Sequence, residues 1–318
     1  MSIWIASAPC CWGVDNIKNP HLPPWEKVLD EAAQAGYSGI ELGPYGYLSL
    51  DIDTTREALT ARGLQVVAGT IFDDLVDPDN HARLIQQAHD ICSFLKGLPE
   101  LPRAEQQRYP APYLVLIDHV HEARSLTAGH SDRAPRLDEH VWQQTMQQIG
   151  ALADIAAEYG VRAVIHPHAG GYIEFEDEIE RLLSDIPAER AGLCLDTGHL
   201  YYSGMDPLAW LQRYAARMDY LHFKDIDPVV YEHVMQEGID FFDACAQGVM
   251  CPIGQGVIDY DAIRALLSRM DYQGYITIEQ ERDPRHVDGS LRDVMTSLDY
   301  LRKAGFHTEV AQSARTIS

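Results

Sequence analysis

Four short apolar stretches in the second half of the chain each end in a histidine or an acidic residue. These end residues are His166, Asp196, His222 and Glu279. In a barrel of parallel strands the C-terminal strand ends meet at one face, so side chains at those ends converge. Two imidazoles and two carboxylates suit Mn²⁺, Co²⁺, Fe²⁺ or Zn²⁺, of which we favour Mn²⁺. The pattern therefore predicts a metal site, and the alternative is four unrelated strand ends that are each hydrogen-bonded locally.

The alternation of side chains along the last two of these strands adds two more candidates. Successive side chains of a strand point to opposite faces, so His222 shares a face with Lys224 and Glu279 shares one with Glu281. We expect these faces to point into the barrel mouth.

Glu41, Lys224 and His199 are the candidates for acid–base chemistry. Glu41 closes an early strand and could remove a proton or bind substrate hydroxyls, or it could form a structural salt bridge. A lysine beside a divalent cation has a lowered pKa, so Lys224 could transfer protons or stabilise an oxyanion, or instead pair with Asp225 or Glu279. His199 could support a metal ligand, contact substrate or cap the next helix.

Aromatic residues near the strand ends offer flat surfaces for sugar rings, although each can also be ordinary packing. His168 precedes Gly170 and Gly171, where the backbone can approach a ligand closely. The predicted substrate-binding residues are Trp12, His168, Tyr201 and Glu281.

Apolar stretches alternate with helical patterns along the whole chain. The expected strands are 3–8, 39–42, 64–68, 113–117, 162–166, 192–196, 219–223 and 275–279. The expected helices are 25–35, 54–61, 80–95, 138–159, 176–184, 207–215, 260–268 and 291–303. Eight strands that are each followed by a helix predict an α/β fold, the (β/α)8 TIM barrel. A doubly wound fold is the alternative, but the glycine-rich turn typical after its first strand is absent from the sequence.

The chain has 318 residues, of which 46% are hydrophobic, and this is enough for one large core. We expect a single barrel domain over residues 1–305 and a polar C-terminal tail over residues 306–318. Two long connections, 119–137 and 226–256, follow strand ends and should lie at the active-site mouth.

The formal net charge of −23 disfavours a nucleic-acid partner and, more weakly, anionic substrates such as sugar phosphates. No apolar stretch approaches the roughly 18 residues of a membrane span, and the first residues lack a signal-peptide pattern. The six cysteines show no CxxC spacing, which is typical of a reduced protein. We therefore expect a cytoplasmic protein without membrane or nucleic-acid partners.

Six stretches of the chain carry a resemblance to known proteins: Ala35–Gly43, His166–His168, Asp196–Gly204, His222–Asp225, Phe241–Asp259 and Glu279–Pro284. They resemble the xylose-isomerase-like superfamily of sugar isomerases and epimerases, and more narrowly its inosose (2-keto-myo-inositol) dehydratase group. In much of this superfamily the fifth strand ends in a glutamate that binds metal and moves protons. His166 takes that place here, which favours the dehydratase branch over a two-glutamate epimerase mechanism.

The resemblance implies a metal-dependent lyase of inositol catabolism that dehydrates a keto-cyclitol or keto-sugar through a metal-stabilised enolate. Alternatives with the same site are a ketose or keto-sugar isomerase or epimerase, and a lyase that cleaves 3-keto glycosides. An abasic-site nuclease shares the barrel but is disfavoured by the acidic charge, and a non-catalytic sugar-binding barrel would hold no metal tightly. The resemblance also implies a homo-oligomer.

Overall fold

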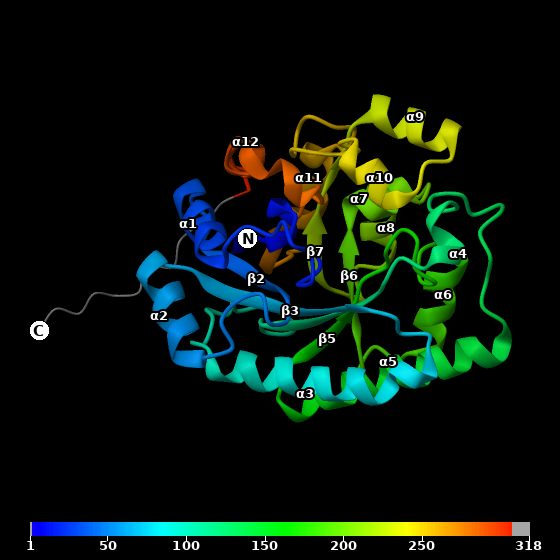
Figure 1. Ribbon diagram of the computed structural model, residues 1–318, viewed down its shortest axis with the longest axis horizontal. Coiled ribbons are helices and arrows are strands. Elements are labelled where there is room, and N and C mark those ends of the chain that lie inside the picture. The colour runs from blue at the N-terminus through cyan, green and yellow to red at the C-terminus, as the bar shows by residue number, and fades with distance from the viewer. Residues whose placement is uncertain (1, 307–318) are drawn as a thin grey trace, which may run out of the picture.

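The computed structural model describes residues 2–306 and folds them into a closed barrel of parallel strands surrounded by helices (Figure 1). β1 pairs with β2 on one side and with β10 on the other, which closes the barrel. The predicted (β/α)8 TIM barrel is therefore confirmed, whereas the predicted tail lies outside the described residues from 307 onward. The barrel strands are β1 (Ile3–Ser7), β2 (Gly39–Pro44), β3 (Gln65–Asp73), β4 (Tyr113–Asp118), β5 (Arg162–Ile165), β6 (Gly192–Asp196), β7 (Met218–Phe223) and β10 (Gly274–Ile278).

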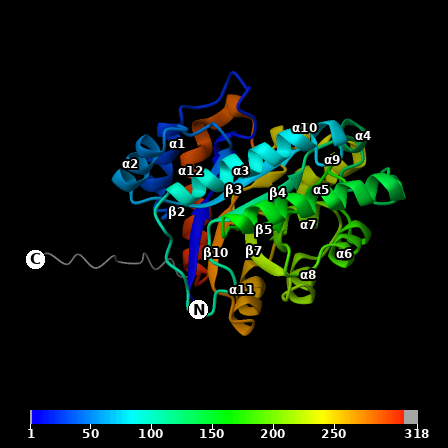
Figure 2. The same cartoon turned by 90° about the horizontal axis from the view of Figure 1, so that it is seen from below.

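Helices cover the outside of the barrel, and Figure 2 shows α3 and α5 side by side there. Within residues 2–306, no helix is long and apolar enough to cross a bilayer. The helices are α1 (Trp25–Ala35), α2 (Ile52–Arg62), α3 (His81–Gly97), α4 (Glu122–Ser125), α5 (Glu139–Glu158), α6 (Glu176–Asp185), α7 (Thr197–Tyr202), α8 (Pro207–Arg213), α9 (Pro228–Glu237), α10 (Phe241–Ala246), α11 (Tyr260–Arg269) and α12 (Ser290–Lys303), with short 3₁₀ helices η1 (Pro9–Trp12), η2 (Pro78–Asn80) and η3 (Pro284–Gly289).

Aspartates begin many of these helices. Asp138 accepts a hydrogen bond from the backbone N–H of Val141 at the start of α5, and Asp196 does the same for His199 at the start of α7. Such caps satisfy backbone donors that the first helical turn leaves unpaired. Asp196 thereby connects the end of β6 to the start of α7, and its second carboxylate oxygen remains available for the barrel mouth.

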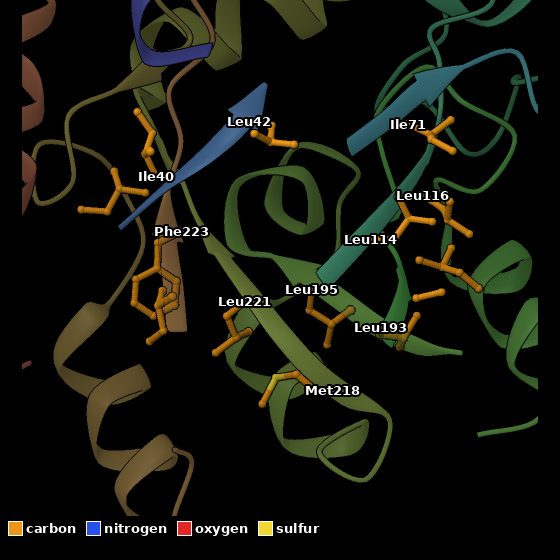
Figure 3. Close-up of a cluster of buried hydrophobic side chains, with 14 of the residues drawn as sticks. Ile40, Leu42, Ile71, Leu114, Leu116, Leu193, Leu195, Met218, Leu221 and Phe223 are labelled. Carbon is orange, nitrogen blue, oxygen red and sulfur yellow. The ribbon is translucent and has the colours of Figure 1, made fainter. Parts of the chain in front are cut away.

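Alternate side chains of the strands enter two separate cores. Leu221 and Phe223 of β7 belong to the layer between strands and helices, part of which Figure 3 shows. Tyr220 belongs to a second cluster, inside the barrel. His222 therefore continues the inner face, because neighbouring side chains of a strand alternate. Asp196 of β6 is its register partner, so the two side chains begin side by side.

Both long connections contain elements that the sequence patterns did not indicate. The first contains α4. The second contains α9, α10 and the short strand β9 (Met250–Cys251), which pairs with β8 (Asp225–Ile226). Figure 1 shows α9 and α10 beyond the C-terminal ends of β6 and β7. This places the second connection at the barrel mouth, as predicted.

Candidate metal centre

The four predicted metal ligands converge at the C-terminal end of the barrel. Each of His166, Asp196, His222 and Glu279 offers one ligand atom, and these atoms all lie within 4.8 Å of one another. The first three side chains are buried, and that of Glu279 is 12% exposed. Nε2 of His166 lies 3.4 Å from Oδ2 of Asp196, and Nδ1 of His222 lies 3.0 Å from Oε2 of Glu279. The arrangement can hold one cation.

The chemistry of these residues fits a divalent cation. The buried Nδ1 atoms of His166 and His222 make no hydrogen bond within residues 2–306. Buried polar atoms without a partner are rare and call for an explanation such as an ion. The carboxylates of Asp196 and Glu279 supply the negative charge that such an ion needs, and burial favours pairing that charge.

Glu41 lies behind His222 and fixes the orientation of its ring. Oε1 of Glu41 is 2.9 Å from Nε2 of His222 and also accepts a hydrogen bond from Tyr220 at 2.6 Å, while Thr70 donates to Oε2 at 3.3 Å. A carboxylate in this place keeps the proton on Nε2 of His222 and leaves Nδ1 free to bind a metal. Because Glu41 is only 2% exposed and already holds these groups, its position favours orientation of the ligand over proton removal from a substrate.

Lys224 is buried among three carboxylates. Its Nζ lies 2.8 Å from Asp196, 2.5 Å from Glu279 and 3.0 Å from Glu281. Burial lowers the pKa of Lys224, but the three carboxylates outweigh burial and hold this pKa well above the ordinary lysine value. The lowered pKa that a bound divalent cation would cause stays a prediction. In this arrangement Lys224 is a fixed ammonium, suited to stabilising an oxyanion.

The same charges act on the acids and on His222. Burial raises the pKa of Asp196, but Lys224, His199 and His166 outweigh it and hold the pKa well below the ordinary range. Burial lowers the pKa of His222, but Cys194, Glu279 and Glu41 raise it well above the ordinary histidine value. The carboxylates that raise the pKa of His222 would also attract a metal cation, which would take the place of the proton on Nδ1.

His168 and His199 form a second pair of imidazoles beside the centre, with ring centroids 4.0 Å apart. Nδ1 of His168 lies 2.8 Å from the carbonyl oxygen of Ala169, which can only accept, so the proton of His168 is on Nδ1. The backbone N–H of Ala169 donates to Nδ1 of His199 at 3.1 Å, so the proton of neutral His199 is on Nε2. The Nε2 atoms of the two rings therefore have opposite hydrogen-bonding roles. Nε2 of His168 is an acceptor, and Nε2 of His199 is a donor.

Glu281 connects this pair to the centre. Its Oε1 lies 3.5 Å from Nε2 of His199 and 3.0 Å from Nζ of Lys224. The structure thus brings Glu281, His168 and His199 together around the predicted ligands. The proximity of these three to a bound substrate stays a prediction.

Trp12 and Tyr201 make other contacts. Trp12 is fully buried in the layer between barrel and helices, and its indole N–H donates to Glu31 at 2.6 Å, which agrees with the packing alternative. Tyr201 is half-buried and lines a surface groove of about 480 Å³ that also contains Tyr231 and Ile258.

Sequence reasoning missed residues that hold the site from outside the strands. Phe241 of α10 contacts the rings of His168 and His199, with centroids 5.2 and 5.5 Å apart. Arg124 and Glu174 form a buried ion pair, and Glu174 accepts a hydrogen bond from Gly170 in the turn after His168. No local pattern marks these residues, because their partners are distant in sequence.

The model of the xylose isomerase-like TIM barrel family matches residues 29–304. The chain belongs to this family. The rhizopine catabolism protein MocC of Rhizobium meliloti is 31% identical over 290 residues, which are 90% of this chain and 84% of that protein. An inosose dehydratase of Geobacillus kaustophilus (strain HTA426) is also 31% identical over 290 residues, with 88% of each chain covered.

The solved structure of an IOLI protein with a bound zinc atom superimposes with a TM-score of 0.68 at 16% identity, covering 95% of this chain and 97% of that one. At this identity the likeness supports the fold alone. Taken with its family and relatives, the chain is an enzyme of the dehydratase or the isomerase/epimerase class.

Proposed function

We propose that this chain is a metal-dependent lyase that removes water from a keto-cyclitol or keto-sugar, as an inosose dehydratase does. The observation that carries the proposal is an acceptor Nε2 on His168 and a donor Nε2 on His199, both beside a candidate metal centre. Dehydration next to a carbonyl needs a base for the α proton and a donor for the departing hydroxyl. The relatives named inosose dehydratase support the same reaction class.

His166, Asp196, His222 and Glu279 would hold the cation, and we favour Mn²⁺. When bound, the cation would act as a Lewis acid toward the substrate carbonyl. The zinc atom bound by the IOLI protein, which has the same fold, supports a divalent ion here. Glu41 would keep His222 in its ligand tautomer.

Nε2 of His168 would take the proton from the carbon beside the carbonyl. The electrons of the broken C–H bond move into an enolate, and the Lys224 ammonium would stabilise the developing oxyanion. Nε2–H of His199 would hold the β hydroxyl by a hydrogen bond. The enolate then re-forms the carbonyl, a C=C bond forms, and the C–O bond to the β hydroxyl breaks. His168 gives its proton to the departing hydroxide, which leaves as water, and His168 returns to its starting state.

Substitution of His168 tests this assignment. His168→Gln should bind the metal as the parent does but lose about 10²- to 10⁴-fold in turnover, the usual contribution of a general base. His140→Gln, at an exposed site on α5, is the matched control. A folded His168→Gln variant with parental turnover would show that His168 is not the base. If only Glu41→Gln or only Lys224→Met lost exchange of the substrate proton next to the carbonyl, that residue would be the base instead.

A ketose or keto-sugar isomerase or epimerase, or a 3-keto-glycoside lyase, is the second candidate. The observation that favours it is the same base beside the same centre, because all of these reactions begin with removal of a proton next to a carbonyl. They differ in whether the proton returns to carbon or a β substituent leaves.

We further propose that the enzyme is cytoplasmic and acts as a homo-oligomer on a small molecule. All six cysteines are free thiols in the structure, which supports a reducing compartment.

A further inference from the structure

A second group of metal-ligand side chains lies outside the barrel centre, on the loops that follow β3 and β4. Asp74 follows β3, and His119 and His121 follow β4. One ligand atom of each lies within 4.8 Å of the others. These three residues have no role in the reaction proposed above.

Asp74 directs one carboxylate oxygen at His119. Its Oδ1 accepts the backbone N–H groups of Val76 and Asp77, both at 2.9 Å, which fixes the carboxylate. Its Oδ2 lies 3.7 Å from Nε2 of His119, too far for a hydrogen bond. Two ligands of one tetrahedral zinc, each about 2.1 Å from the ion, lie about 3.4 Å apart, which is close to this separation.

A buried carboxylate orients His121. Nε2 of His121 lies 2.9 and 3.0 Å from the two oxygens of Asp118, which is 3% exposed. Asp118 is itself fixed by the backbone N–H groups of Leu75 and Tyr172, at 3.2 and 2.7 Å. The proton of His121 therefore belongs on Nε2, and Nδ1 is the nitrogen with a free lone pair. Glu41 acts on His222 in the same way.

The backbone of the two histidines is held at fixed points. His119 N–H donates to the carbonyl of Asp73, and His121 N–H donates to that of Gly170, both at 3.0 Å. The two rings meet edge to face with centroids 4.4 Å apart. The side chains of His119, Asp74 and His121 are 37%, 30% and 12% exposed, so an ion can enter from solvent and keep a water ligand.

We propose that Asp74, His119 and His121 form a second divalent-cation site, of the zinc class, with Asp118 as its orienting carboxylate. Two imidazoles, one carboxylate and a water are a common zinc ligand set. A bound ion would join the loops after β3 and β4, and would stiffen the rim next to the turn that follows His168.

The test is zinc stoichiometry in the full-length protein, measured by equilibrium dialysis against ZnCl₂ after chelator treatment. The parent should bind two equivalents. The Asp196→Asn variant, in which the barrel centre is impaired, should retain the one zinc equivalent bound at the second site. The double variant with Asp196→Asn and His119→Asn should lose this equivalent as well. His119→Asn alone should retain the barrel-centre equivalent. Visible absorption of Co²⁺ bound to Asp196→Asn reports the second site separately.

The control is His233→Asn, at an exposed site on α9, which should leave both equivalents. Asp118→Asn should weaken the second site about 10- to 100-fold, as loss of an orienting carboxylate usually does. Equal zinc binding by Asp196→Asn with and without His119→Asn would overturn the proposal, as would the absence of a second equivalent in the parent. Neither result bears on His168 or the barrel centre, so the proposed function is tested separately.

Discussion

At the scale of single residues, the centre depends on hydrogen bonds that decide which nitrogen of each histidine carries a proton. Glu41 sets this state for His222. Glu41→Gln should therefore lower metal affinity about 10- to 100-fold, because an amide holds the ring proton less strongly than a carboxylate. Metal content after dialysis at graded free-metal concentrations measures this. Glu57→Gln, exposed on α2, is the control, and parental affinity in Glu41→Gln would contradict the orienting role.

The pH dependence of turnover belongs to the same scale. Burial, and then His199 and His166, lower the pKa of His168 well below the ordinary value of about 6.5. A bound cation would lower it further. A base with a lowered pKa stays unprotonated to lower pH, so kcat/KM should remain constant from about pH 8 to below about 6.5 and decline only in more acidic solution. The profile needs a parallel measurement of bound metal. A decline centred at or above pH 6.5 with the metal still bound would contradict His168 as the base.

At the scale of elements, the start of α7 packs directly against the end of β7. A Cβ at Gly198 would lie 2.4 Å from Cβ of Lys224, so only glycine permits this approach. Gly198→Ala should destabilise the fold by about 1–3 kcal/mol and reduce kcat by about 10²-fold, because it displaces the Lys224 ammonium. Denaturant unfolding and turnover measure the two effects.

Gly160→Ala is the matched control for this change. Gly160 has a positive φ but open space around it, so its substitution should cost about 1 kcal/mol through backbone strain. Turnover should stay at the parental value. An equal loss of kcat in both variants would mean that the effect at Gly198 is general destabilisation.

The loop that contains α4 is joined to the turn after His168 by a fully buried ion cluster. Arg124 pairs with Glu174 and Glu178 at 3.2 and 2.7 Å, and Arg124 and Glu174 are both 0% exposed. Arg124→Met should destabilise the fold by about 3–5 kcal/mol, because it removes the buried positive charge that is paired with Glu174. Arg181→Met, which breaks the exposed pair with Glu139, should cost less than about 1 kcal/mol. Similar losses of unfolding free energy in the two variants would contradict the importance assigned to the buried cluster.

At the scale of the whole molecule, the sequence predicted the barrel and the four converging candidate ligands because both follow from strand periodicity. In β7, His222 alternates with Leu221 and Phe223, so strand periodicity places it on the face opposite these two apolar residues. The end of β3 was misjudged, since the prediction stopped at residue 68 whereas the strand continues to Asp73. A glycine such as Gly69 often marks the end of a strand. Here it lets α3 pack closely against β3, because a Cβ at this position would lie 2.5 Å from Ile91 of α3.

The remaining features depend on contacts that no local pattern reveals. Glu41 and His222 are 181 positions apart, and their pairing required the closed barrel. The tautomers of His168 and His199 depend on two backbone groups of Ala169 in a turn whose course the sequence does not define. The position of Phe241 over these rings depends on the path of the second long connection.

In the proposed reaction, the barrel centre and His168 together remove water from a keto-cyclitol. NMR in D₂O with 2-keto-myo-inositol and Mn²⁺-loaded enzyme tests it directly, with the paramagnetic ion removed before the product is measured. We expect a dione formed by loss of water, and no product from His168→Gln or from chelator-treated enzyme. An intact sugar that has gained deuterium or changed configuration would contradict dehydration in favour of an isomerase or epimerase.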